Sequence, residues 1–190
     1  KLSKNIVDLF NSSTAIFFNL ETVLLNNNFN KSKFKLQNKD IHIYNDKENS
    51  IKYLQNVIKP PIFMSTINNH TFDFGEEGYQ NTLKILDKYN YKFTVKKTYY
   101  IDNSIIYLNA TDHWTIINNN DINYPENSKL WDNNCLLINN LEKELYTYKL
   151  ISYLNKIKGN RKIIFSIHWG RNYINSNNTD TYLYDKYKTF

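Results

Sequence analysis

The sequence is poor in residues that define several protein classes. Its 190 residues include one cysteine, three prolines, four glycines and two alanines. A lone Cys135 excludes an intrachain disulfide and the cysteine-rich metal motifs. No apolar run approaches the roughly 18 residues that a membrane-spanning helix needs. We therefore expect no transmembrane segment in this chain.

Asparagine, lysine, isoleucine and tyrosine are abundant instead, a bias typical of an AT-rich genome. The formal net charge is +6, and 16% of the residues are aromatic. Nucleic-acid binding would need Lys and Tyr gathered on one face, but the lysines are dispersed among 18 acidic residues. We interpret the densest run, with Lys31, Lys33 and Lys35, as a solvated face rather than a polyanion contact. Nucleic-acid binding is the least favoured function.

The hydrophobic pattern predicts a single α/β domain over residues 1–190, with its core at 4–174 and an irregular tail at 175–190. Strands, buried on both faces, and helices alternate along the chain. The predicted strands cover residues 14–20, 40–44, 62–66, 91–95, 98–102, 104–110 and 162–170. The predicted helices cover residues 6–10, 46–57, 76–89 and 135–158, the last ended by Gly159, and residues 110–132 form a long loop.

Polar residues gather where three of the predicted strands stop. Glu21 follows "AIFFNL", Asn69 and His70 follow "IFMSTIN", and His168 follows "IIFSI". In α/β sheets, binding sites form outside the carboxyl ends of the strands. A carboxylate, a carboxamide and two imidazoles form a ligand set suited to zinc, manganese or iron. A histidine at a strand end is, however, also a common structural residue, so the residues alone leave both interpretations open.

The other polar residues in predicted strands and loops differ in what they indicate. Glu21 follows mostly apolar residues directly, and a carboxylate is costly to bury without a partner. This position favours a functional role for Glu21. We interpret His42, inside a predicted strand, and His113, in the predicted loop, as structural.

Three segments resemble motifs of the bacterial capsule synthesis CapA/PgsA family, which acts in poly-γ-glutamate synthesis. "FFNLETVL" resembles the family's NLE motif, "STINNHTFDFGEEGYQNTLKIL" its NNHxxDxGxxGxxxTL motif and "SIHWGRNY" its HWGxEY motif. They occur in the family's order, and the resemblance covers residues 4–174. It implies a calcineurin-like metallophosphoesterase fold, a layered β-sandwich flanked by helices. Asp73 and Gly75 are expected to shape the turn and cap the following helix.

The resemblance also implies a site with two metal ions, manganese, iron or zinc. Glu21 takes the place of the acidic residue that bridges the metals, Asn69 that of the metal-binding amide, and His168 that of a metal-binding imidazole. His70 takes the place of the catalytic imidazole that contacts the reacting group of the substrate. Such metals activate a water molecule and neutralise a developing oxyanion.

The family's pattern is incomplete at both ends of this chain. No strand ending in "GD" precedes Asn5, no histidine follows His168, and Asn172 replaces the glutamate of HWGxEY. Two accounts remain open. In one, another segment or a partner chain supplies the missing ligands, and the assembly is a metal-dependent hydrolase or transferase acting on an anionic cell-surface polymer at the cell surface or membrane. In the other, the domain is an inactive structural or interaction subunit without metal.

Overall fold

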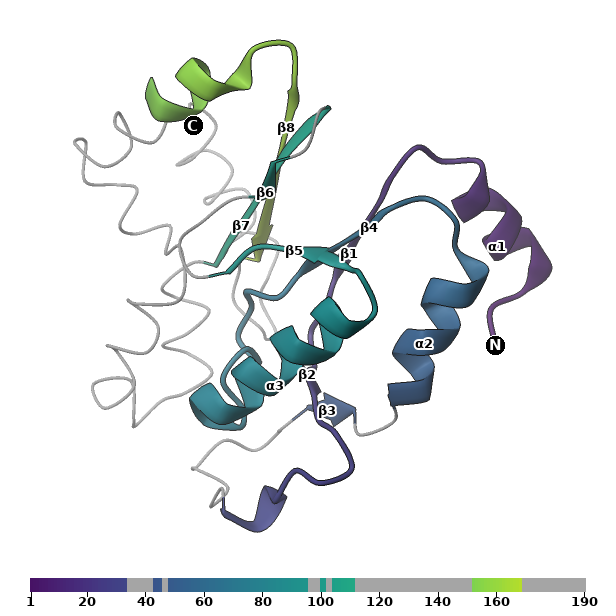
Figure 1. Ribbon diagram of the computed structural model, residues 1–190, viewed down its shortest axis with the longest axis vertical. Helices are drawn as coiled ribbons and strands as arrows, with labels where there is room; N and C mark the ends of the chain where they lie inside the picture. Colours follow the sequence, from purple (N-terminus) through teal and green to yellow (C-terminus); the bar gives the residue numbers. More distant parts are fainter. Residues whose placement is uncertain (34–42, 46–47, 96–99, 102–103, 112–151, 169–190) are drawn as a thin grey trace, which may run out of the picture.

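The part of the chain that the structure describes is built around two three-stranded sheets (Figure 1). The computed structural model describes residues 1–33, 43–45, 48–95, 100–101, 104–111 and 152–168. The first sheet has the all-parallel order β1 (Ile16–Asn19), β4 (Ile62–Ser65) and β5 (Lys92–Phe93). In the second, β7 (Ile105–Thr111) pairs antiparallel with β6 (Tyr100–Ile101) and parallel with β8 (Lys162–His168). A short parallel pair joins β2 (Val23–Leu24) to β3 (Tyr44–Asn45).

Helices connect these strands, so the predicted α/β class is confirmed. They are α1 (Lys4–Asn11), α2 (Glu48–Val57), α3 (Gly75–Lys88), a 3-10 turn η1 (Lys31–Lys33) and a helical segment at residues 152–158. Ser3 caps α1 by accepting a hydrogen bond from the Ile6 N–H. Gly159, at a φ of 50°, follows the helical segment as the sequence predicts. None of the helices among the described residues is long and apolar enough to cross a bilayer.

Helices cover one face of the first sheet. Side chains alternate between the two faces of a strand, and one set points toward α1, α2 and α3, which lie beside this sheet in Figure 1. The sheet contributes Ile16, Phe18, Ile62 and Met64 to this core, and the helices contribute Phe10, Ile51, Ile85 and Leu86. Both faces of β4 are buried, as predicted for a strand of a parallel sheet.

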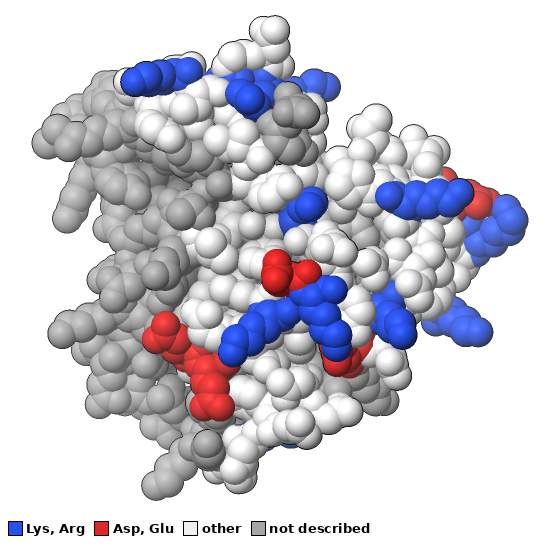
Figure 2. Space-filling model, viewed as in Figure 1, with Lys and Arg blue, Asp and Glu red and all other residues white. Residues whose placement is uncertain are grey.

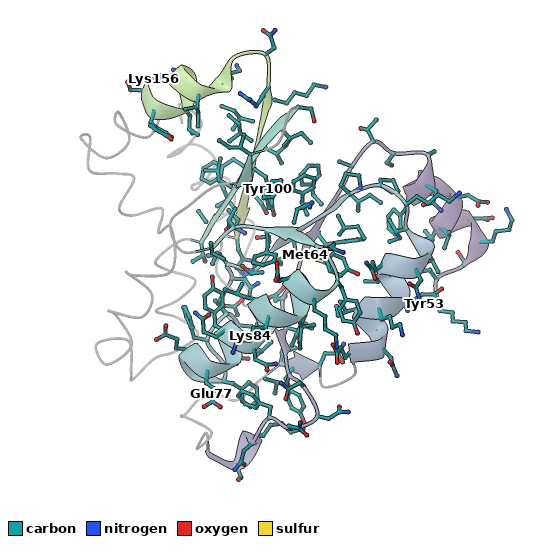
Figure 3. The ribbon with its side chains drawn as sticks, viewed as in Figure 1. Tyr53, Met64, Glu77, Lys84, Tyr100 and Lys156 are labelled. Carbon is teal, nitrogen blue, oxygen red and sulfur yellow. The ribbon has the colours of Figure 1, made fainter. Side chains whose placement is uncertain are left out.

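The other face of the first sheet meets the second sheet through aromatic rings. The Phe17 and Phe63 rings stack with centroids 4.8 Å apart, and they lie 5.4 and 5.3 Å from the Tyr107 ring of β7. Tyr100 of β6, labelled in Figure 3, lies 5.6 Å from Phe63. Because ring edges and faces attract, these contacts join the two sheets.

The outer face of the second sheet packs on the helical segment at residues 152–158. Leu154 of that segment clusters with Ile106, Leu108 and Ala110 of β7. The strand predicted at residues 104–110 is observed at Ile105–Thr111, so the predicted loop does not begin at Ala110, which is fully buried and pairs with Ile167 of β8. The strand continues because burial and ladder hydrogen bonds outweigh the weak strand propensity of alanine.

Several sequence predictions fall outside the described residues. These are most of the strand at 40–44, the loop beyond residue 111, the helix before residue 152 and the tail at 175–190. His42, His113, Lys35 and Cys135 also lie outside them. The division of the chain into one domain stays a prediction.

The N-terminal half of α3 is held tightly against β2. The Leu24 N–H donates to Thr82 Oγ1 at 3.0 Å, and Asn81 Nδ2 donates to the Leu24 carbonyl at 2.8 Å. A Cβ added to Gly78 would lie 2.5 Å from Phe74 Cβ and 3.2 Å from Val23 Cγ1. Gly78 therefore permits a close approach of helix and strand.

We expect Gly78→Ala to destabilise the protein. Alanine in place of a helical glycine normally stabilises by roughly 0.5–1 kcal/mol, but here the added methyl overlaps Phe74 Cβ, a rigid neighbour. Overpacking of this kind costs about 1–3 kcal/mol. Urea denaturation measures the loss. Glu77→Ala, at the exposed neighbouring position, should change stability by less than about 0.5 kcal/mol. A Gly78→Ala variant more stable than the wild type would contradict this packing.

Candidate functional site

The candidate site lies where β1, β4 and β8 end. β1 and β4 run parallel in register, with Asn19 opposite Ser65, so both carboxyl ends reach the same edge of the first sheet. Glu21 follows β1 by two residues, and His70 follows β4 by five. β8 ends in the second sheet at His168, opposite Thr111 of β7.

The carboxamide of Asn68 joins the ends of β1 and β4. Its Nδ2 donates to the Leu20 carbonyl at 2.9 Å and to Asn19 Oδ1 at 3.3 Å. Its Oδ1 accepts the His70 N–H at 3.0 Å. The side chain thus satisfies backbone groups that no strand ladder reaches. No local pattern in the sequence predicts this role for Asn68, although it is the first residue of the NNH triplet.

A tight turn follows β4 and presents the next two residues. Thr71 Oγ1 accepts the Asn68 N–H at 2.8 Å and lies 2.6 Å from the Asn68 carbonyl and 2.9 Å from the Thr66 carbonyl. This hydroxyl closes the turn on itself, as threonine and serine often do. Asn69 and His70 are buried within it. The sequence offered no signal for Thr71 beyond its place in the motif.

Glu21 and His168 approach each other from different sheets. Glu21 Oε1 lies 3.9 Å from His168 Nε2, and the two side chains are 42% and 20% exposed. Asn19 Nδ2 donates to Glu21 Oε2 at 3.3 Å. A partly exposed carboxylate and imidazole therefore face the same space, although their sequence positions are far apart.

His70 pairs with Asp73. Its Nδ1 lies 2.7 Å from Asp73 Oδ2, and both side chains are buried. The same carboxylate oxygen accepts the Ile43 N–H at 2.7 Å. The prediction that Asp73 caps the following helix is wrong, since the N-cap of α3 is Phe74, which makes no side-chain capping bond. Gly75 does shape the turn, at a φ of 60°.

The predicted site residues thus fall into two neighbouring groups. Glu21 approaches His168, while Asn69 and His70 lie in the turn after β4, with His70 held by Asp73. Within the described residues, no cluster of three or more His, Cys, Asp or Glu side chains has the arrangement of a metal site. Metal binding and the roles assigned to these residues stay predictions.

A family model for bacterial capsule synthesis proteins, PGA_cap, matches residues 1–184. The chain belongs to this family. No curated protein and no solved structure gives a significant match. The CapA/PgsA resemblance of the three motifs is therefore confirmed, and with it the link to capsule synthesis at the level of the family.

The PGA_cap match spans all three segments whose ends form the candidate site, from Glu21 through His70 to His168. In this member of the family, hydrogen bonds link the first two segments through Asn68, and the third meets the first at the 3.9 Å approach of His168 to Glu21. The motifs of the capsule synthesis protein are therefore neighbours in space as well as signatures in sequence.

We expect Asp73→Asn to destabilise the protein by about 1–3 kcal/mol, the cost of leaving buried polar groups poorly paired. The variant removes the charge that holds His70 and weakens the acceptor of the Ile43 N–H. Chemical denaturation of both proteins measures the difference. Asp87→Asn, at an exposed position of α3, serves as the matched control. Equal stability of the Asp73 and Asp87 variants would show that the buried pair contributes nothing.

Proposed function

We propose that the chain acts in the synthesis of poly-γ-glutamate or a related anionic cell-surface polymer, through a metal-dependent centre at the ends of β1, β4 and β8. The family assignment supports the biological context. The approach of Glu21 to His168 at 3.9 Å carries the chemical part. Polar side chains that the sequence separates widely meet there at an accessible edge.

The proposal includes a layered, metallophosphoesterase-like sandwich. Its support is the packing of the two sheets against each other through Phe17, Phe63 and Tyr107. Helices pack on the outer face of each sheet, from α2 and α3 on one side and from residues 152–158 on the other. This order of helix, sheet, sheet and helix is what the family resemblance implies.

The donor chemistry of the site fits a divalent metal in part. Two donor atoms bound at about 2.1 Å to one ion lie about 3.0–3.4 Å apart at tetrahedral or octahedral angles. The Glu21 and His168 donors, at 3.9 Å, need only a small side-chain movement to reach that spacing. Asn69 would add an amide oxygen from the turn after β4. The remaining ligands would come from another segment or from a partner chain.

A bound metal would supply an activated water molecule and neutralise a developing oxyanion. The chain itself orients His70 through the 2.7 Å contact of its Nδ1 with Asp73 Oδ2, and the tautomer with its hydrogen on Nδ1 would present Nε2 as an acceptor. The second hydrogen bond of Asp73, from the Ile43 N–H, fixes the carboxylate in turn. These two contacts hold the His70 ring in one orientation, as a catalytic imidazole requires.

The alternative function is that of an inactive structural or interaction subunit. It is favoured by the small number of titratable ligands that the described residues bring together. Nucleic-acid binding has less support. On the face drawn in Figure 2, lysine and arginine side chains are scattered, with acidic side chains between them.

Metal analysis of the purified full chain tests the proposal. We expect bound manganese, iron or zinc, and saturable binding of Mn²⁺ in calorimetric titrations. Glu21→Gln and His168→Gln should each weaken Mn²⁺ binding by tenfold or more. Even the loss of a residue that only hydrogen-bonds to a metal ligand typically lowers metal affinity by about 10–100-fold.

Glu77→Gln, on the exposed surface of α3 (Figure 3), is the control and should bind Mn²⁺ as the wild type does. Equal binding by the wild type and both site variants would contradict the assigned ligands. A chain that binds no metal, while still associating with other capsule synthesis proteins, would establish the inactive subunit instead.

A further inference from the structure

Polar residues lie near the ends of the facing strands: Ser65 and Asn109 are buried, Ser166 is half-buried and Asn19 is exposed. Register pairs Asn19 with Ser65 in the first sheet and Asn109 with Ser166 in the second. Two residues before Asn19, Ser65 and Asn109, and on the same faces of the strands, lie the aromatic rings of Phe17, Phe63 and Tyr107. The space between the sheets therefore changes from aromatic to polar toward the candidate site.

Tyr107 extends from the aromatic layer toward these polar residues. It is fully buried, and the rings of Phe17 and Phe63 fix its own ring at 5.4 and 5.3 Å. Burial raises the pKa of the Tyr107 hydroxyl, and the nearby side chains of Ser166, Ser65 and Asn109 partly oppose that rise. The hydroxyl thus stays protonated at neutral pH and is available as a donor.

The Tyr107 hydroxyl lies near the side chains of Ser166, Ser65 and Asn109, yet three polar atoms here make no hydrogen bond of normal geometry within the described residues. They are the hydroxyl oxygens of Ser65 and Tyr107 and the Nδ2 of Asn109. All three residues are at most 2% exposed. Asn109 Oδ1 accepts a hydrogen bond from the Thr94 hydroxyl at 2.5 Å. This contact orients the amide, and Asn109 Nδ2 can then donate to a further acceptor. Buried polar atoms in native proteins almost always have a partner.

We propose that an ordered water molecule is bound between the sheets and bridges the Tyr107 hydroxyl, the Ser65 hydroxyl and the Asn109 amide. Buried water typically makes about three hydrogen bonds to otherwise unsatisfied groups, and three groups converge here. A water molecule also suits this mixture, since it accepts from the amide and exchanges hydrogen bonds with either hydroxyl.

The water site would join the two sheets at the level immediately before Glu21 and His168. Ser65 belongs to the sheet that carries Glu21, whereas Tyr107 and Asn109 belong to the sheet that carries His168. The bridge would therefore help to hold the two halves of the candidate site together. It is independent of metal binding and of the proposed function.

A crystal structure that resolves ordered solvent tests the water site directly. We expect a solvent peak at about 2.7–3.2 Å from Tyr107 Oη and within hydrogen-bond reach of Ser65 Oγ or Asn109 Nδ2. A direct hydrogen bond between Tyr107 and Ser65 or Asn109, or a dry interface, would overturn the proposal.

A double-mutant cycle tests it in solution. Tyr107→Phe and Ser65→Ala should each lower the urea midpoint, and the double variant should lower it by less than the sum of the two shifts, because both remove partners of one water molecule. Tyr91→Phe is the matched control, since the buried Tyr91 hydroxyl donates directly to the Ile51 carbonyl at 2.7 Å. Its shift should add to that of Ser65→Ala. Simple additivity of the Tyr107 and Ser65 shifts would count against a shared water.

Discussion

The candidate site depends first on one carboxamide, that of Asn68. Strands end by leaving backbone groups without ladder partners, and such groups must be satisfied if they are buried. Asn68 does this for two segments at once, donating to the Leu20 carbonyl and accepting the His70 N–H. The positions of Glu21, one residue after Leu20, and of His70 are therefore set by the same side chain. A longer or shorter residue at position 68 could not make both contacts.

The long second motif serves the fold as much as any chemistry. Asp73 ties the turn to the Ile43 backbone, Gly78 lets α3 approach β2, and Thr82 accepts the Leu24 N–H. Each of these roles would remain in a protein that catalysed nothing. An intact NNHxxDxGxxGxxxTL motif therefore argues for this local architecture, and it does not by itself argue for an enzyme.

The sequence predicted elements whose pattern is local. β4 and α3, predicted at residues 62–66 and 76–89, are observed at Ile62–Ser65 and Gly75–Lys88. These predictions succeed because the spacing of apolar residues and the turn residues that end each element are local features of the sequence. It could not predict the role of Asp73, whose partner Ile43 is 30 positions away. It also ended β7 one residue early, at Ala110, because the pairing of Thr111 with His168 of β8 is a contact between distant parts of the chain.

The sequence predicted which residues form the candidate site but not how they are arranged in space. Strand ends pointed to Glu21 and His168, yet these residues lie in different sheets, and no local pattern sets how two sheets pack. That packing is decided by the rings of Phe17, Phe63 and Tyr107, whose mutual contacts bring the two strand ends to the same place. Asp73, Gly78 and Thr82 have structural tasks that account for their presence. The partly exposed pair of Glu21 and His168 is different, because exposed charged groups add little to stability. The choice between an enzyme and an inactive subunit therefore rests on this pair.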